Sequence, residues 1–279
     1  MAALVKRASR LSWPFLARAS WVLLASISLG LILLMVPINI RTIYFAWTFE
    51  QSYRAVADFM TQKTYASIYM ALNYGVAALC YCVAGLIAWR RAAEPVAWLA
   101  AVLLALVPIM FSLGGYSETW SYYPLPWRDI FKYLREFLAW AVGLSSMLAF
   151  IFLFPNARST PRWTAVLLGL LSVTMVLTTI ALMLGLVTDA YGGWLGSFIT
   201  SLALGAGIQI YRYRRLSSPI ERQQTKWVVA ALAGIAGAMV VVTILNVLAE
   251  NGRYAALVQL LAQLTSVTML AFLPLALAF

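Results

Sequence analysis

Histidine is absent from this sequence of 279 residues, and charged residues make up only 10% of it. The lack of histidine excludes histidine-ligated zinc or haem, triads that need histidine, and autophosphorylation on histidine. Cys80 and Cys82 are two positions apart, so on a helix they point to nearly opposite faces and cannot chelate a metal together. The sequence also lacks nucleotide-binding glycine–lysine motifs and acidic clusters. We therefore expect no catalytic, cofactor-binding or metal-binding residues, and a chain that is not an enzyme by itself.

The residues that are abundant are apolar. Hydrophobic residues make up 63% of the chain, and the mean hydropathy is +0.87, whereas a soluble domain is roughly 45–50% apolar. A helix needs about 20 apolar residues to cross a bilayer. The sequence predicts an all-α fold: a polytopic helical bundle forming a single membrane domain over 1–279. The eight predicted spans are 20–38, 67–89, 96–114, 136–154, 163–187, 190–211, 226–249 and 254–279.

The distribution of charge predicts the orientation. With the N-terminus in the cytoplasm, the inner segments hold 13 of the 20 Lys and Arg residues and only Glu94 and Glu221 of the nine acids. This excess follows the positive-inside rule, so the net charge of +11 predicts membrane topology and not a nucleic-acid partner. We expect a multi-pass protein of the bacterial cytoplasmic membrane, with both termini cytoplasmic and the lipid bilayer as its first partner.

The first outer segment predicts a helix lying in the membrane interface over about 43–62. Its apolar residues recur every three or four positions, while its charged residues fall on another face. The apolar positions are Phe45, Phe49, Tyr53, Val56 and Met60.

The second outer segment, about 116–135, is rich in aromatic residues. A non-helical stretch with two prolines is followed by a helical stretch, in which Arg128, Asp129, Lys132 and Glu136 can pair one turn apart. Two interpretations of the aromatic residues stay open. They can form an anchoring belt at the membrane boundary, or a recognition surface for an apolar or peptide ligand. The candidate surface comprises Tyr116, Trp120, Tyr122, Tyr123 and Trp127.

The predicted spans carry no charge near their centres, which disfavours an ion-coupled carrier. Mild polar residues such as Ser145 and Gln209 are expected to serve packing. Small residues at four-residue steps are expected to let helices approach closely. These rows are Ser26 with Gly30, Cys80 with Ala84 and Ala88, Ala203 with Gly207, and Ala233 with Gly237.

Two inner loops carry a resemblance. Phe152-Leu153-Phe154-Pro155-Asn156-Ala157-Arg158 precedes Pro161-Arg162-Trp163, and Arg212-Tyr213-Arg214-Arg215 leads into Ser218-Pro219-Ile220-Glu221-Arg222-Gln223-Gln224-Thr225-Lys226-Trp227. This pairing resembles the multi-span membrane input region of bacterial sensor histidine kinases of the competence or quorum-sensing type. Ala157 departs from the glycine usual in that group. The resemblance covers about spans three to eight.

The resemblance implies a sensory input domain of a two-component system. In that group a cytoplasmic kinase part follows the last span; it is missing here, so we expect either an input module separated from its kinase or a stand-alone protein with the same membrane fold. The implied partner is a cytoplasmic signalling domain. Two alternatives stay open. The first is a non-catalytic structural subunit of a larger membrane complex, energy-transducing complexes included. The second is a small carrier or lipid-handling protein.

Overall fold

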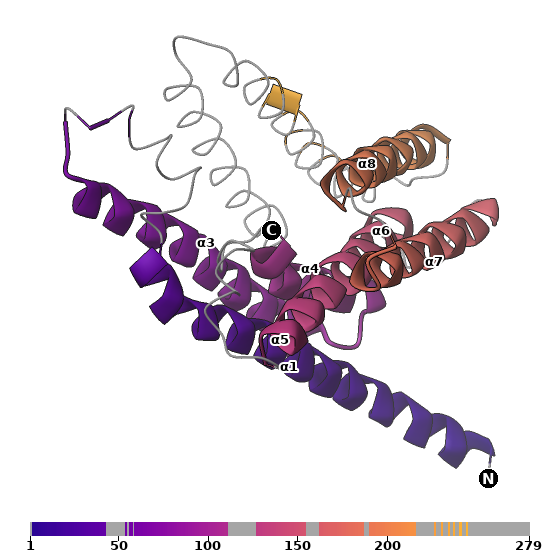
Figure 1. Cartoon of the computed structure of the whole chain (residues 1–279). Helices are drawn as coiled ribbons and strands as arrows, with labels where there is room; N and C mark the ends of the chain where they lie inside the picture. The colour runs from indigo at the N-terminus through magenta and orange to yellow at the C-terminus, as the bar shows by residue number, and fades with distance from the viewer. Residues whose placement is uncertain are drawn as a thin grey trace.

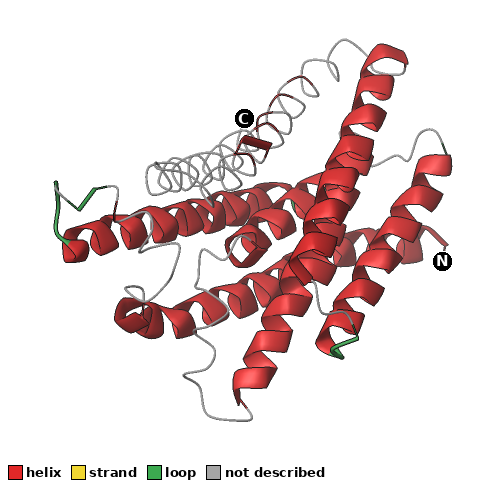
Figure 2. Cartoon of the chain, turned by 45° about the horizontal axis from the view of Figure 1, so that its top comes forward, coloured by secondary structure: helices red, strands yellow, loops and turns green. Residues whose placement is uncertain are grey.

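The computed structural model describes most of the first 215 residues and several single positions beyond them. All elements in this part are helices, and Figure 2 shows no strand among them. The described residues are 2–42, 54, 56–57, 59–110, 127–154, 162–186, 190–215, 226, 230, 234, 237, 240, 241 and 244.

The first six predicted spans each fall on helical segments. Four helical segments are long and apolar enough to cross a membrane: Trp13–Leu34, Gln62–Arg91, Trp127–Leu153 and Trp163–Met183. All of the predicted span 254–279, and most of the predicted span 226–249 and of the interfacial helix over 43–62, lie outside the described residues. The helices are α1 (Ala2–Thr42), α3 (Gln62–Arg91), α4 (Pro95–Met110), α5 (Trp127–Glu136), η3 (Phe137–Leu144), α6 (Ser145–Leu153), α7 (Trp163–Met183) and α8 (Ala190–Arg215).

Local chemistry explains where two of these helices begin and end. The hydroxyl of Thr61 accepts a hydrogen bond from the backbone N–H of Thr64 at 3.2 Å and so caps the start of α3. Helix α7 ends earlier than the predicted 187, because Gly185 adopts a φ of +69°. Its N–H and that of Leu186 bond back to Leu182 and Ala181, which satisfies carbonyls of the last turn.

Helices α1, α3 and α4 pack together through hydrogen bonds between side chains and helix backbones (Figure 1). The indole of Trp21 donates to the carbonyl of Ala101 at 3.2 Å. Ser28 donates to the carbonyl of Ala105 at 2.7 Å and lies 2.6 Å from the Tyr81 hydroxyl. The later residue of α1 contacts the later residue of α4, so α1 and α4 run parallel. Such bonds hold helices together where water cannot compete.

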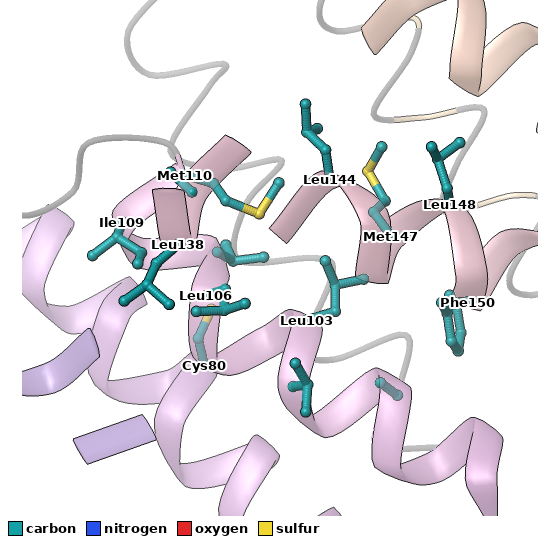
Figure 3. Close-up of a cluster of buried hydrophobic side chains, with 14 of the residues drawn as sticks. Cys80, Leu103, Leu106, Ile109, Met110, Leu138, Leu144, Met147, Leu148 and Phe150 are labelled. Atoms are coloured by element: carbon teal, nitrogen blue, oxygen red, sulfur yellow. The ribbon is translucent and has the colours of Figure 1, made fainter. Parts of the chain in front are cut away.

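A second group of contacts joins α4 to the segment η3–α6, and its side chains form the main apolar core. Figure 3 shows Met110 of α4 close to Leu138 and Leu144 of η3, with Leu103 and Leu106 further along α4. Gly143 makes this approach possible, because a Cβ there would lie 2.6 Å from the Met110 sulfur. The close contact fixes α4 against the middle of the fourth predicted span.

The structure confirms one of the predicted rows of small residues on α1 and α3 and contradicts the other. Cys80, Ala84 and Ala88 are buried, as predicted, and Cys82 on the other side of α3 is exposed. The prediction for Ser26 is wrong, since it is exposed and Ser28 is the serine that packs. A Cβ on its partner Gly30 would meet nothing within 4 Å, so that position brings no helix close.

The fourth span departs from a regular helix. The sequence predicts one continuous span over 136–154, but Phe137–Leu144 is a π-helix between α5 and α6.

The predicted pairing of charges one turn apart on α5 is wrong. None of the ion pairs in the described part of the chain joins two α5 residues one turn apart. Arg128 pairs with its neighbour Asp129 at 3.2 Å, and the Lys132 ammonium lies 6.0 Å from the Tyr133 ring centre.

Candidate functional site at the ends of α6 and α8

The structure describes one residue of the predicted outer recognition surface. Trp127 is the first residue of α5; it is exposed, and its ring stacks on Phe131 with a centroid distance of 6.2 Å. This position fits both the anchoring belt and the recognition surface. The other four, Tyr116, Trp120, Tyr122 and Tyr123, lie outside the described residues.

The best-defined polar arrangement lies instead at the C-terminal end of α6. A helix leaves its last carbonyls without partners in the helix itself. Here the backbone becomes extended at Phe154, directly after the end of α6 at Leu153, and Ile151 and Phe152 in the last turn are buried. The carbonyls of Ile151, Phe152 and Phe154 therefore need donors from elsewhere, in a place where most of the surroundings are apolar.

Helix α8 supplies these donors from one face. The side-chain amide of Gln209 donates to the carbonyls of Ile151 and Phe154, the latter at 3.2 Å. The guanidinium of Arg212 donates to the carbonyl of Phe152 at 2.9 Å. We call this set of residues, together with Gly205, the α6–α8 junction.

Gly205 determines how closely the two helices approach. A Cβ at this position would lie 2.5 Å from a methyl carbon of Ile151, so only glycine fits without a shift. Gly205, Gln209 and Arg212 are spaced by four and three residues and share one face of α8. The predicted packing row of Ala203 with Gly207 is wrong, because both residues are exposed.

Burial gives the α6–α8 junction its electrostatic character. Gln209 is 1% exposed and Arg212 is 5% exposed. A cation near helix carbonyls is favourable, since the C-terminal end of a helix carries partial negative charge. One oxygen is left over: Oε1 of Gln209 is buried without a hydrogen-bond partner among the described residues.

The α6–α8 junction can hold helices in a defined relative position. It contains amide and guanidinium donors and backbone acceptors, but no nucleophile with a base beside it. In the described part of the chain, no group of three or more His, Cys, Asp or Glu side chains could hold a metal. Breaking and remaking these few bonds would let α8 move relative to α6.

Sequence reasoning missed this site. It treated Gln209 as a packing residue, and it used Arg212 as an inner positive charge and as part of the Arg-Tyr-Arg-Arg run of the resemblance, without a structural role for its side chain. The available signal was the spacing of Gly205, Gln209 and Arg212, which places a glycine, a buried amide and a cation on one helix face. The contacts join the helix ends that precede the two quoted loops: Gln209 donates to Phe154 and Arg212 donates to Phe152.

Comparison with known proteins gives no relative for this chain. No family model, no curated protein and no solved structure matches it.

Proposed function

We propose that this chain is a membrane-embedded signal-input domain, like the membrane region of a sensor histidine kinase, and is non-catalytic by itself. The observation that carries the proposal is the α6–α8 junction. It links the end of the fourth predicted span to the helix that leads into the basic loop after Arg215. A change in that span would therefore reach a loop that we expect to face the cytoplasm.

We infer that η3, in the same span, can convert from a π-helix to an α-helix. Ser145, directly after η3, has a buried hydroxyl without a hydrogen-bond partner in the described part of the chain. In α7, by contrast, the hydroxyls of Thr174 and Thr179 bond to the carbonyls four residues earlier. An α-helical segment before Ser145 would offer it the same bond, so the unpartnered hydroxyl favours a π-to-α conversion.

Such a conversion would be transmitted along the span. Each residue of an α-helix adds about 100° of rotation and 1.5 Å of rise. Losing the wider π turns would therefore rotate α5 relative to α6. Trp127 and the charged residues of α5 lie at one end of this movement, and the α6–α8 junction lies at the other. Binding or a change of membrane state at the outer end would select one conformation.

The proposal includes a location in the bacterial cytoplasmic membrane, with the α6–α8 junction on the inner side. The charge distribution along the sequence supports this orientation. The partner would be a cytoplasmic signalling domain, on the same or another polypeptide.

The test measures whether a change at the outer end alters the inner end. Spin labels are attached at Arg90→Cys and Arg215→Cys, which lie in the last turns of α3 and α8 and are both exposed, in a Cys82→Ala background. Trp127→Ala then removes the stacked indole from α5. In lipid nanodiscs we expect the electron–electron distance distribution between the labels to change in shape or mean.

Phe59→Ala is the matched control, since Phe59 is an exposed aromatic of the other predicted outer segment, 84% exposed and not on α5. It should leave the distribution between the labels unchanged. If Trp127→Ala also leaves it unchanged, the outer end is not coupled to the α6–α8 junction, and the input-domain proposal is wrong.

A specific observation favours a second function, that of a structural subunit in a larger membrane complex. Helix α7 is the least buried of the four candidate spans. Its exposed large apolar residues recur at alternating steps of three and four, a pattern suited to a neighbouring helix as well as to lipid. Cross-linking through this face to another membrane protein would support the subunit. The residues are Trp163, Val166, Leu170, Val173, Leu177, Ile180 and Leu184.

A further inference from the structure

The last turn of α8 carries a second, outward-facing group of residues. Tyr211, Arg214 and Arg215 are spaced by three and one residues, lie on adjoining parts of the helix surface and are all exposed. Arg212, in the same turn, points the other way into the α6–α8 junction. We call the three exposed residues the α8 basic face.

The end of α3 has a similar composition but a different electrostatic situation. Arg90 and Arg91 follow the exposed Trp89, yet Arg91 pairs with Glu94 at 3.8 Å. The ring and carbonyl of Trp89 are already engaged by Arg18, at 5.4 Å and 3.0 Å. At the end of α3, the carboxylate of Glu94 therefore neutralises part of the positive charge.

Among the described residues, the α8 basic face has no such partner. Neither Arg214 nor Arg215 forms an ion pair within the part of the chain that the structure describes. Besides the buried Arg212, the segment from Tyr211 to Lys226 holds four cations and one carboxylate. The segment from Trp89 to Pro95 holds two cations and one carboxylate, and Arg18 lies beside it as a third cation. An external anion is therefore needed more at the end of α8.

We propose that the α8 basic face binds the headgroup of an anionic phospholipid. Arginine forks match the geometry of phosphate oxygens, and tyrosine favours the level of the headgroups. A lipid fits better than a soluble anion, because Ile210 and Leu204 expose apolar surface on the preceding turns of α8, where acyl chains can lie. The inference stands whether or not the chain is a signal-input domain.

Native mass spectrometry of the full chain in detergent tests this directly. The protein is titrated with phosphatidylglycerol and, separately, with phosphatidylcholine that has the same acyl chains. We expect tighter binding of phosphatidylglycerol. In Arg214→Gln/Arg215→Gln its affinity should fall about 25-fold, since each basic residue near a membrane surface contributes about fivefold. Phosphatidylcholine binding should not change.

Arg90→Gln/Arg91→Gln is the matched control and should lose only about fivefold in phosphatidylglycerol affinity, because Arg91 already pairs with Glu94 and only Arg90 is left to attract the lipid. Equal binding of both lipids to the unmodified protein, or an equal loss in both double variants, would overturn the proposal. So would competition by soluble glycerol phosphate at the same concentration as the lipid. If the Arg214/Arg215 variant does not fold, the unmodified protein is measured at two salt concentrations. Raising ammonium acetate from about 0.1 to 0.5 M must reduce its preference for phosphatidylglycerol. An unchanged preference contradicts the assignment.

Discussion

Replacing Arg212 by methionine tests the α6–α8 junction most sharply. Methionine keeps the apolar stem of the side chain but removes the guanidinium that donates to the Phe152 carbonyl at 2.9 Å. The carbonyl would be left without that donor at a site where Arg212 is 5% exposed, so water cannot easily replace it. We expect the variant to fold, with a smaller free energy of unfolding.

Opposing effects determine the size of this loss. A hydrogen bond to a charged group contributes about 1.5–3 kcal/mol, whereas uncharged side-chain bonds in membranes average only about 0.6 kcal/mol. Removing a charge from the membrane recovers some energy, but less than the roughly 2.5–3.5 kcal/mol found at a helix centre, because Arg212 lies within a turn of the basic end of α8. The net destabilisation should be about 1–2 kcal/mol.

The assay is unfolding by SDS titration in mixed micelles, followed by circular dichroism. Arg214→Met is the control, because it makes the same chemical change at an exposed position two residues away. It should alter the free energy of unfolding by less than about 0.5 kcal/mol. If the Arg212 and Arg214 variants unfold at the same SDS fraction, the Arg212 bond contributes nothing and the reasoning on the α6–α8 junction is refuted.

Two further experiments test close packing and a buried polar contact. Gly205→Ala should destabilise the protein by about 1–3 kcal/mol, because the new Cβ would lie 2.5 Å from the stiff, β-branched Ile151. Gly207→Ala, where a Cβ meets nothing within 4 Å, should be neutral or stabilising by up to about 1 kcal/mol; the same SDS titration compares them, and equal effects would contradict the close approach. For Ser28 and Tyr81, 2.6 Å apart, a double-mutant cycle with Ser28→Ala and Tyr81→Phe should give a coupling energy of about 0.6–1.7 kcal/mol. A coupling of zero would mean that this contact does not hold α1 to α3.

Much of the helical organisation could be predicted from the sequence. Each of the first six apolar runs lies on a helical segment, and a helix forms its backbone hydrogen bonds between residues of the same run. The helix faces were harder, since they depend on the partner. On α3 the row Cys80, Ala84 and Ala88 was predicted correctly. On α8 the predicted row was wrong, because Ile151 meets Gly205 and not its neighbour two residues on.

The π-helix and the α6–α8 junction could not be predicted, for related reasons. The π geometry of η3 coincides with the approach of Met110 to Gly143, a contact between different helices. The role of Arg212 depends on where α6 ends in space, since its acceptor is a backbone carbonyl and not a charged side chain. A charge count along the sequence identifies the arginine but not the carbonyl that it binds.

The central claim is that this chain delivers a signal to a cytoplasmic output domain. Its most direct test is the mass of the native polypeptide in its own membranes, detected with an antibody against 127–136 after brief cross-linking in intact cells. We predict a species larger than the 30.8 kDa of this chain, or one of 30.8 kDa cross-linked to a soluble cytoplasmic protein. A 30.8 kDa species cross-linked only to other membrane proteins would contradict the account and support the structural subunit.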